Sequence, residues 1–508
     1  MKSRLAQLAV VFSISFTSAF AQDLASFEKR VTVKSLANGL TLLVLQRPEA
    51  PVFAFFTHVD AGSAQDPKGA TGLAHMFEHM AFKGTDKIGT RNYAAEKVAL
   101  EKVEKAYAAY DYERHKLVAK DPKKIAELEK EWKAAIDVAD QYVIKNQFGE
   151  IVEREGGEGL NASTDEDETA YHYSMPANRV ELWAYLESER FLHPVMREFY
   201  KERNVVMEER RMRTDSEPTG RLVEQFIASA FVAHAYHRPT VGWMSDLESF
   251  SATDAARFFE QYYIPANMVV AVVGDVKAAD VVPLVEKYFG RLPARPKPEE
   301  LRTVEPPQTA ERQAVLREAT QPFYLEGYHR PAFDDPDDAV YDAITDLMSN
   351  GRTSRLFRAL VRDKKTAAYA AGFSGLPGVK YPHLFAFYAV PLPGHTPAEM
   401  RDGIHAEIER IKKQDITDDE LKMIKTRARA DLIRGLADNQ GLAYQLATAQ
   451  ARYGDWRELF GQVDRIERVS KADIRRIANK TFTVENRTVG IIENVPPTAP
   501  PSQSGGAQ

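Results

Sequence analysis

The sequence predicts an α+β protein built from two homologous domains, each a mostly antiparallel sheet with helices on one face. Three observations lead to this class: strand and helix patterns alternate along the chain, one set of signals recurs at a fixed spacing, and a proline-rich stretch separates the two copies. The 508 residues are 44% hydrophobic and 10% aromatic. Such a composition excludes a disordered or collagen-like chain and is ample for more than one core.

The strand pattern is clearest near the start of the chain. Residues 31–36 and 40–45 alternate apolar side chains around an Asn38-Gly39 turn, which predicts a β-hairpin. A further strand is expected at 53–59. Residues 268–273 form a continuous apolar strand, and 281–289 has the periodicity of a helix.

The repeat is visible at the ends of the two halves. Ser251 with Asp254, and Ser470 with Asp473, have the Ser-x-x-acid spacing of a capped helix start. Each helix is followed by an Asn and then a strand. All three positions in the second half lie 219 residues after their counterparts in the first, and the sequence therefore predicts a duplication.

These signals divide the chain into segments. We expect a first domain over residues 22–291, a Pro/Glu/Arg-rich linker at 292–308 and a second domain over 309–495. Residues 93–150 are charged and Ala-rich, with a break at Asp121-Pro122. They predict a projecting two-helix hairpin, which we interpret as a solvated arm without chemistry.

The two ends predict export and a loose tail. Lys2 and Arg4 precede an apolar run that closes on Ala19-Phe20-Ala21, so residues 1–21 have the form of a signal peptide, typical of a periplasmic protein of a Gram-negative bacterium. Residues 496–508 are rich in Pro, Ser and Gly, and we expect them to be disordered.

Composition also excludes classes of partner and site. The net charge of -6 gives no reason to expect nucleic acid, and no later apolar run is long enough for a membrane span. With no cysteine, disulfides, thiolate metal sites and cysteine nucleophiles are all excluded. Any metal must be bound by histidines and carboxylates. A serine hydrolase and an ATPase are disfavoured, because Gly-x-Ser-x-Gly and Walker-type motifs are missing.

One short segment predicts metal chemistry. Residues 71–85 read TGLAHMFEHMAFKGT, with an apolar stripe at helical spacing and a Gly84 stop. His75 and His79 lie one turn apart, so both imidazoles can bind one ion, and Zn²⁺ suits such ligands. Glu78 would act as the base in this inverted His-x-x-Glu-His motif.

A third protein ligand is required, and the residues alone leave it open. The acidic candidates downstream are Asp165, Glu166, Glu168, Glu202, Glu208 and Glu209. Glu202 and Glu209 lie two turns apart on one helix face. One could bind the metal while the other hydrogen-bonds a ligating histidine.

The motif GLAHMFEHMAFKGT resembles the zinc helix of the pitrilysin/insulinase peptidases, and is most similar to the mitochondrial processing peptidase branch and its bacterial relatives. The similarity continues in KERNVVMEER, YYIPANMVVAVVGDV and GRTSRLFRALVRDKKTAAY, and spans about residues 31–492. The interval from His79 to Glu209 is about fifty residues longer than the family usually has, which the charged hairpin accounts for.

The resemblance implies a zinc-dependent endopeptidase that cleaves short or unfolded polypeptides. It assigns Glu209 as the third ligand, Glu202 as the acid behind a ligating histidine, and Asn161 with Ala162 as the edge strand that pairs with substrate. Arg362 and Tyr369 correspond to the Arg/Tyr pair that contacts substrate and the developing oxyanion. Since the family's chamber needs four such domains, a homodimer, or a heterodimer with a related chain lacking the motif, is implied.

The duplication predicts a single zinc per chain. Allowing for the insertion, His75, Glu78 and His79 correspond to Asp342, Thr345 and Asp346, and Glu209 corresponds to Ala428. The second half therefore lacks the metal ligands. The alternative function is a non-catalytic assembly or chaperone-like subunit of the same fold, since some relatives keep the fold without proteolysis.

Overall fold

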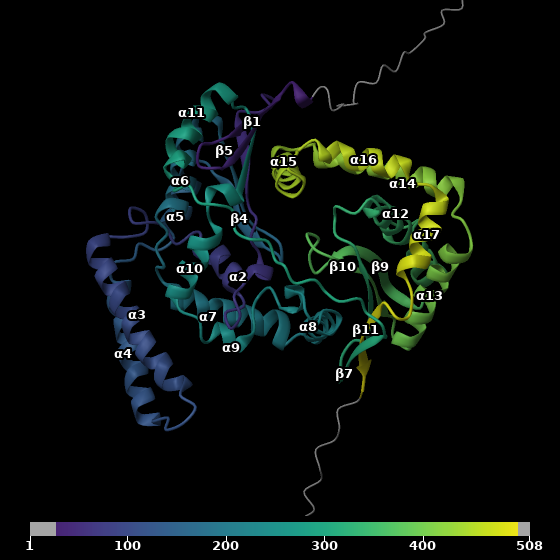
Figure 1. The fold of residues 1–508 in the computed structure, drawn as a ribbon, viewed down its shortest axis with the longest axis horizontal. Helices are drawn as coiled ribbons and strands as arrows, with labels where there is room; N and C mark the ends of the chain where they lie inside the picture. Colours follow the sequence, from purple (N-terminus) through teal and green to yellow (C-terminus); the bar gives the residue numbers. More distant parts are fainter. Residues whose placement is uncertain (1–26, 496–508) are drawn as a thin grey trace, which may run out of the picture.

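The computed structural model describes residues 27–495, so the expected signal peptide and C-terminal tail lie outside the described residues. The described part forms two sheets, each with its own helices, and the first half lies to the left of the second in Figure 1. The predicted α+β class with duplicated halves is confirmed.

Six strands form the sheet of the first half, in the order β1-β2-β6-β3-β5-β4. Only the β2–β6 pair is parallel in this sheet. The strands are β1 (Val31–Ser35), β2 (Thr41–Gln46), β3 (Val52–Val59), β4 (Glu158–Thr164), β5 (Thr169–Pro176) and β6 (Met268–Gly274). The hairpin predicted at the Asn38-Gly39 turn is present, and Gly39 has a φ of +96°, which side chains disfavour.

Five strands form the second sheet, in the order β7-β11-β8-β10-β9, with β7 and β11 parallel and the other pairs antiparallel. The strands are β7 (Arg312–Glu318), β8 (Phe323–Arg330), β9 (Ala367–Leu376), β10 (His383–Pro391) and β11 (Arg487–Asn494). This order and pairing repeat those of the first sheet from β2 onward, so β4 and β9 are corresponding edge strands. Among the described strands, β1 has no counterpart.

The repeat extends to individual hydrogen bonds. The Asn267 side chain donates to the carbonyls of Asp60 and Tyr262. Asn486, 219 residues later, donates in the same way to the carbonyls of His329 and Thr481. Both predicted capped helix starts, at 251–254 and 470–473, form reciprocal capping boxes. The duplication thus preserves the bonds that join each last helix to its sheet.

Ten helices are described in the first half and six in the second. They are α2 (Leu73–Met80), α3 (Tyr93–His115), α4 (Pro122–Asp140), α5 (Gln147–Arg154), α6 (Val180–Leu192), α7 (Phe199–Arg210), α8 (Pro218–Ala230), α9 (Met244–Leu247), α10 (Ala252–Tyr262), α11 (Ala278–Tyr288), α12 (Asp338–Ser349), α13 (Pro397–Lys413), α14 (Asp418–Gly435), α15 (Asn439–Tyr453), α16 (Glu458–Arg468) and α17 (Lys471–Thr481). No helix among the described residues combines the length and apolar character that a bilayer crossing requires.

Each sheet is covered on both faces, and the two covers come from different halves. In the first sheet, alternate residues such as Leu42 and Val44 belong to the core of the half's own helices, while Leu43 and Leu45 belong to a cluster with Leu446 of α15. α15 belongs to the second half, and Figure 1 shows it beside the first sheet.

The exchange is reciprocal. Helix α8 of the first half packs on the second sheet, where Phe226 shares a hydrophobic cluster with Leu325 and Leu384. Gly327 makes room for it, because a Cβ at that position would lie 2.8 Å from the Phe226 ring. Since α8 and α15 occupy corresponding places in the repeat, the two halves exchange equivalent helices and share their cores.

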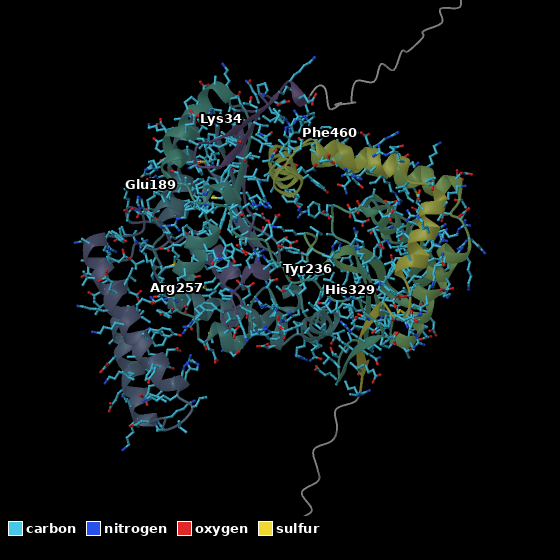
Figure 2. The ribbon with its side chains drawn as sticks, viewed as in Figure 1. Lys34, Glu189, Tyr236, Arg257, His329 and Phe460 are labelled. Atoms are coloured by element: carbon cyan, nitrogen blue, oxygen red, sulfur yellow. The ribbon has the colours of Figure 1, made fainter. Side chains whose placement is uncertain are left out.

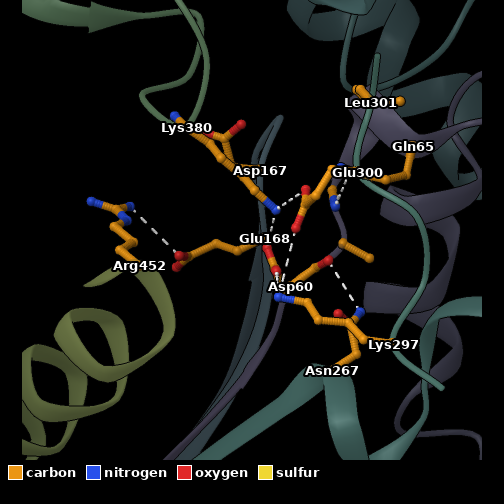
Figure 3. A network of polar contacts seen from close by, with 12 residues as sticks. Asp60, Gln65, Asp167, Glu168, Asn267, Lys297, Glu300, Leu301, Lys380 and Arg452 are labelled. Atoms are coloured by element: carbon orange, nitrogen blue, oxygen red, sulfur yellow. Dashed lines mark hydrogen bonds and ion pairs between the residues drawn. The ribbon is translucent and has the colours of Figure 1, made fainter. Parts of the chain in front are cut away.

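A polar network joins the halves where they meet (Figure 3). The Asp167 carboxylate, in the turn after β4, accepts hydrogen bonds from the Val379 and Lys380 amides and from the Tyr236 hydroxyl. The Lys380 ammonium lies 2.7 Å from Asp60 at the end of β3. Tyr236 lies near the middle of the molecule in Figure 2. These bonds fix the turn after β4 against the second half.

Candidate metal centre

Helix α2 carries the motif residues on a firmly anchored segment. Its apolar stripe is buried, with Leu73 and Met76 fully inaccessible. The Asp66 carboxylate accepts hydrogen bonds from the amides of Gly72 and Ala74, at 2.6 and 2.9 Å, and so caps the helix N-terminus from outside. The helix ends at Met80. Gly84, expected at its end, lies four residues further on, with a φ of +91°.

The structure brings His75, His79 and Glu209 together. The Nε2 atom of His75 lies 3.7 Å from one carboxylate oxygen of Glu209, and the Nε2 atom of His79 lies 3.4 Å from the other. One donor atom from each of the three residues lies within 4.8 Å of the others. Helix α7 supplies Glu209, so two helices of the first half build the cluster.

These distances fit a shared tetrahedral cation. Nitrogen and oxygen ligands about 2.0–2.1 Å from Zn²⁺ are about 3.3 Å apart at the tetrahedral angle. The separations of 3.4 and 3.7 Å, each to a different oxygen of the Glu209 carboxylate, are close to this value and longer than ordinary hydrogen bonds. Two imidazoles and one carboxylate also suit zinc chemically and leave a fourth position open. The three residues therefore fit a zinc ion.

The electrostatics of His75 favour its metal-binding form. Burial is the largest effect and lowers the pKa of His75 to about 4, so the imidazole is neutral at pH 7. A neutral imidazole has the free lone pair that a metal needs. The Nδ1 atom of His75 is buried and has no hydrogen-bond partner among the described residues.

Glu202 supports His79 from behind. Its carboxylate lies 3.5 Å from the Nδ1 atom of His79, on the side away from Glu209, and also pairs with Lys83. Burial lowers the pKa of His79, but the hydrogen bond that His79 donates to Glu202 and the charges of Glu209 and Glu202 outweigh it and raise the pKa. Of the two acids that the sequence left open, Glu209 therefore faces both imidazoles, and Glu202 orients one of them.

Glu78 lies beside the cluster and toward solvent. Its carboxylate is 4.0 Å from the Nε2 atom of His75, and its side chain is 24% exposed. Burial is the largest influence and raises the pKa of Glu78 above its usual value. A carboxylate with a raised pKa, in reach of both the cluster and water, suits general-base chemistry.

A cavity of about 460 Å³ opens next to the cluster. Glu78 and His79 line it together with Asn161 and Ala162 of β4, the edge strand of the sheet. Strand β4 pairs with β5 on one side only, so its other edge is free among the described residues to accept an extended chain. The predicted substrate strand is thus adjacent to the predicted metal.

Arg362 and Tyr369 lie elsewhere. Arg362, in the π-helical turn η7 (Phe357–Asp363), is exposed and pairs with Asp363 at 2.6 Å. Tyr369 on β9 is 52% exposed and packs against the Tyr388 ring. The residues that line the cavity beside His79 all come from the first half. Within one chain, the structure does not place the Arg/Tyr pair in this cavity.

A buried clamp beneath α2 has no signal in the sequence pattern. Arg197, 1% exposed, donates to the Glu96 carboxylate at 2.5 and 2.9 Å and to the carbonyls of Lys83, Thr85 and Ile88 just after α2. Glu96 belongs to α3, the first helix of the charged insertion. The base of that insertion is therefore part of the support of α2, which the charge pattern alone did not indicate.

The second half contains a corresponding cavity without the ligands. Its volume is about 550 Å³, and Asp342, Thr345, Asp346 and Ala428 all line it. These are the positions that the repeat aligns with His75, Glu78, His79 and Glu209. Burial and the nearby Asp338 raise the pKa of Asp342 to about 6. The second half, which the sequence predicts to lack the metal ligands, therefore still has a cavity at the equivalent positions.

Comparison with known families matches both halves. The family described as insulinase (peptidase family M16) matches residues 43–125, and the M16 inactive domain matches residues 249–428. The first match contains the motif on α2, and the second contains Asp342, Thr345, Asp346 and Ala428, the positions that replace the motif residues in the second half.

Individual relatives agree. The zinc protease PqqE of Helicobacter pylori is 30% identical, over 94% of this chain and 96% of its own. The crystal structure of a protease from the same species has a TM-score of 0.75 at 27% identity, covering 91% of this chain and 99% of that one. The periplasmic protease PqqL of Escherichia coli has a TM-score of 0.68 at 17% identity. The match covers 92% of this chain but only 48% of PqqL, and it shows the fold alone.

Proposed function

Because this chain belongs to the insulinase family of peptidases, family M16, we propose that it is a zinc-dependent endopeptidase with one zinc ion, bound by His75, His79 and Glu209. The observation that carries the proposal is the convergence of these three side chains, next to the carboxylate of Glu78 and to a strand edge that is unpaired among the described residues. Its relatives are named zinc proteases, which supports the same metal and reaction.

The chain's own residues divide the work of hydrolysis. Zinc, when bound, supplies a Lewis acid that polarises the scissile carbonyl and makes water more acidic. Glu78 accepts a proton from the attacking water and passes it to the leaving amine. Glu202 holds the ring of His79 so that its Nε2 atom faces the metal position. The Arg197 clamp keeps the end of α2 in place under these groups.

Substrate binds as an added strand. An extended peptide pairs with the free edge of β4 near Asn161 and Ala162, and this places a backbone carbonyl beside the cavity that contains Glu78 and His79. Strand addition requires an unfolded backbone, so short or unfolded polypeptides are the substrates. Folded proteins are poor ones.

A full chamber requires a second chain, either a copy of this one or a related chain without the motif. Arg362 and Tyr369 lie outside the cavity of their own chain, and both are exposed. They are available to stabilise an oxyanion or contact substrate in an assembled chamber. We also infer export to the periplasm, supported by the basic and apolar pattern of residues 1–21.

A quenched-peptide assay tests the peptidase function. Hydrolysis of an unstructured peptide is expected to stop when a chelator removes the metal and to return when zinc is resupplied. A stably folded protein that contains a similar amino-acid sequence serves as the control, and it should resist hydrolysis. Absence of hydrolysis in the zinc-loaded protein, alone and mixed with a related chain lacking the motif, contradicts the proposal and favours a non-catalytic assembly role.

A further inference from the structure

The insertion hairpin ends in an exposed apolar tip that the metal chemistry does not use. Helix α3 is about 35 Å long, and Figure 1 shows α3 and α4 projecting away from both sheets. Between them, Leu117 is 99% exposed and Val118 is 81% exposed, and Tyr112 on the last turns of α3 is 71% exposed. Leu117 and Val118 are the most exposed large apolar side chains among the described residues.

The turn at the tip is held by hydrogen bonds and ion pairs of its own side chains. Glu113 accepts a hydrogen bond from the Lys116 ammonium, pairs with Lys124 across the turn, and accepts the Asp121 amide. Asp121 in turn caps the start of α4. Ala119 has a φ of +58°, a left-handed conformation that costs free energy for a residue with a Cβ. The turn is thus strained and held in place by polar contacts, and it keeps two aliphatic side chains exposed to water. This combination indicates a binding surface.

Basic side chains surround the apolar tip. Residues 111–124 contain five Lys or Arg and three Asp or Glu, in a chain whose net charge is -6. Lys120 and Lys123 are exposed, and no ion pair among the described residues involves either one. Basic side chains around exposed aliphatic residues are complementary in charge and polarity to a surface with negative groups on the outside and an apolar layer beneath them.

We propose that the hairpin tip binds the surface of an anionic lipid bilayer, with Leu117 and Val118 inserted at the headgroup level and the lysines on lipid phosphates. The small contact area favours lipid over protein. A stable protein interface buries about 800 Å² on each partner, far more than three side chains supply. Shallow insertion of a few apolar residues beside a basic cluster is sufficient for reversible membrane binding.

Vesicle co-sedimentation tests the proposal. The purified chain is mixed with phosphatidylcholine vesicles that contain about one third phosphatidylglycerol, and with phosphatidylcholine alone. We expect binding only to the anionic vesicles, weakening as salt is raised. The double substitution Leu117→Ser with Val118→Ser, and separately Lys120→Gln with Lys123→Gln, should each weaken binding about tenfold.

The matched control is Val304→Ser, since Val304 is also exposed, at 75%, but lies in the linker. It should bind like the unmodified chain. All variants share the same N-terminal segment, so differences between them report the tip alone. Failure to bind anionic vesicles, or binding that neither double substitution weakens, overturns the proposal. The proposal is also overturned if the chain self-associates in the absence of vesicles and the Leu117→Ser/Val118→Ser variant does not, because the tip would then be a protein contact.

Discussion

From β2 onward, the first sheet has the same strand order and pairing as the second, and the two halves share their Asn-mediated bonds and have corresponding cavities. Among the described residues, only the first half has a set of side chains that could bind a metal. Where the first half has His75, Glu78, His79 and Glu209, the second has two aspartates, a threonine and an alanine around a cavity of about 550 Å³. The difference teaches that the fold does not depend on the metal. The first cavity lies between helices and the edge strand β4, and the second lies between helices α12, α14, α15 and α16. The chemistry was added to, or lost from, one copy.

The largest expected effect is on peptide hydrolysis, which should depend on the cavity of the first half and not on that of the second. Glu78→Gln removes the proton acceptor but keeps the shape and the metal ligands, so peptide hydrolysis should fall about a thousandfold while zinc remains bound. The matched change in the second half, Thr345→Gln, should leave hydrolysis unchanged. Equal activity of Glu78→Gln and the unmodified protein in the quenched-peptide assay would falsify the role of Glu78.

A second comparison concerns the carboxylate behind His79. Glu202→Gln weakens the hydrogen bond that orients the imidazole, so zinc affinity should fall about 10- to 100-fold. The equivalent position in the repeat is Leu421, and Leu421→Gln should leave zinc affinity as it was. Competition with a chromogenic chelator measures both. An unchanged affinity in Glu202→Gln means that Glu202 serves only Lys83.

The second cavity is expected to respond to pH. Burial raises the pKa of Asp342 to about 6, above an ordinary value near 4, so the folded protein binds this proton more tightly than the unfolded chain. Its ionisation therefore costs stability, a cost absent below about pH 4 and fully present above pH 6.

Asp342→Asn should remove that cost, because the amide oxygen can still accept the hydrogen bond from Gln462. We expect the variant to be more stable by about 3 kcal/mol at pH 7, with the gain vanishing toward pH 4. Urea unfolding at both pH values measures it. A variant that is less stable at pH 7 shows that the carboxylate is needed in ionised form.

The smallest expected effect is an equal loss of stability from matched substitutions in the two halves. Asn267→Ala and Asn486→Ala each remove two hydrogen bonds to carbonyls at equivalent places, so each should reduce the free energy of unfolding by about 1–2 kcal/mol. The same denaturation assay measures both variants. A much larger loss in one half means that the repeat has kept the geometry but not the energetics.

Much of the fold could be predicted because its signals are local. The Asn38-Gly39 hairpin, the Ser251 and Ser470 capped helix starts and the strands after Asn267 and Asn486 all follow from short patterns. Their fixed spacing revealed the duplication. The histidine motif needed only one helix turn to be recognised, and the Glu202/Glu209 pair needed only two.

The remaining features depend on residues far apart in the sequence. No periodicity indicates that Arg197 reaches Glu96 and the carbonyls after α2, or that Asp66 caps that helix, because these bonds form only in the folded chain. The exchange of α8 and α15 was also missed, since an amphipathic stripe shows that a helix is buried but not against which sheet. For the same reason the residues alone did not choose Glu209, whose carboxylate faces both imidazoles only after α7 has packed beside α2.

Elemental analysis of the purified protein, unmodified and with Glu209→Gln, tests the central claim most directly. We predict about one zinc per chain in the unmodified protein and almost none in Glu209→Gln. We also predict an unchanged content in Ala428→Gln, which introduces the same side chain at the equivalent position of the second half. Folded protein that binds no zinc after the metal is resupplied, or Glu209→Gln with its full zinc content, would contradict it.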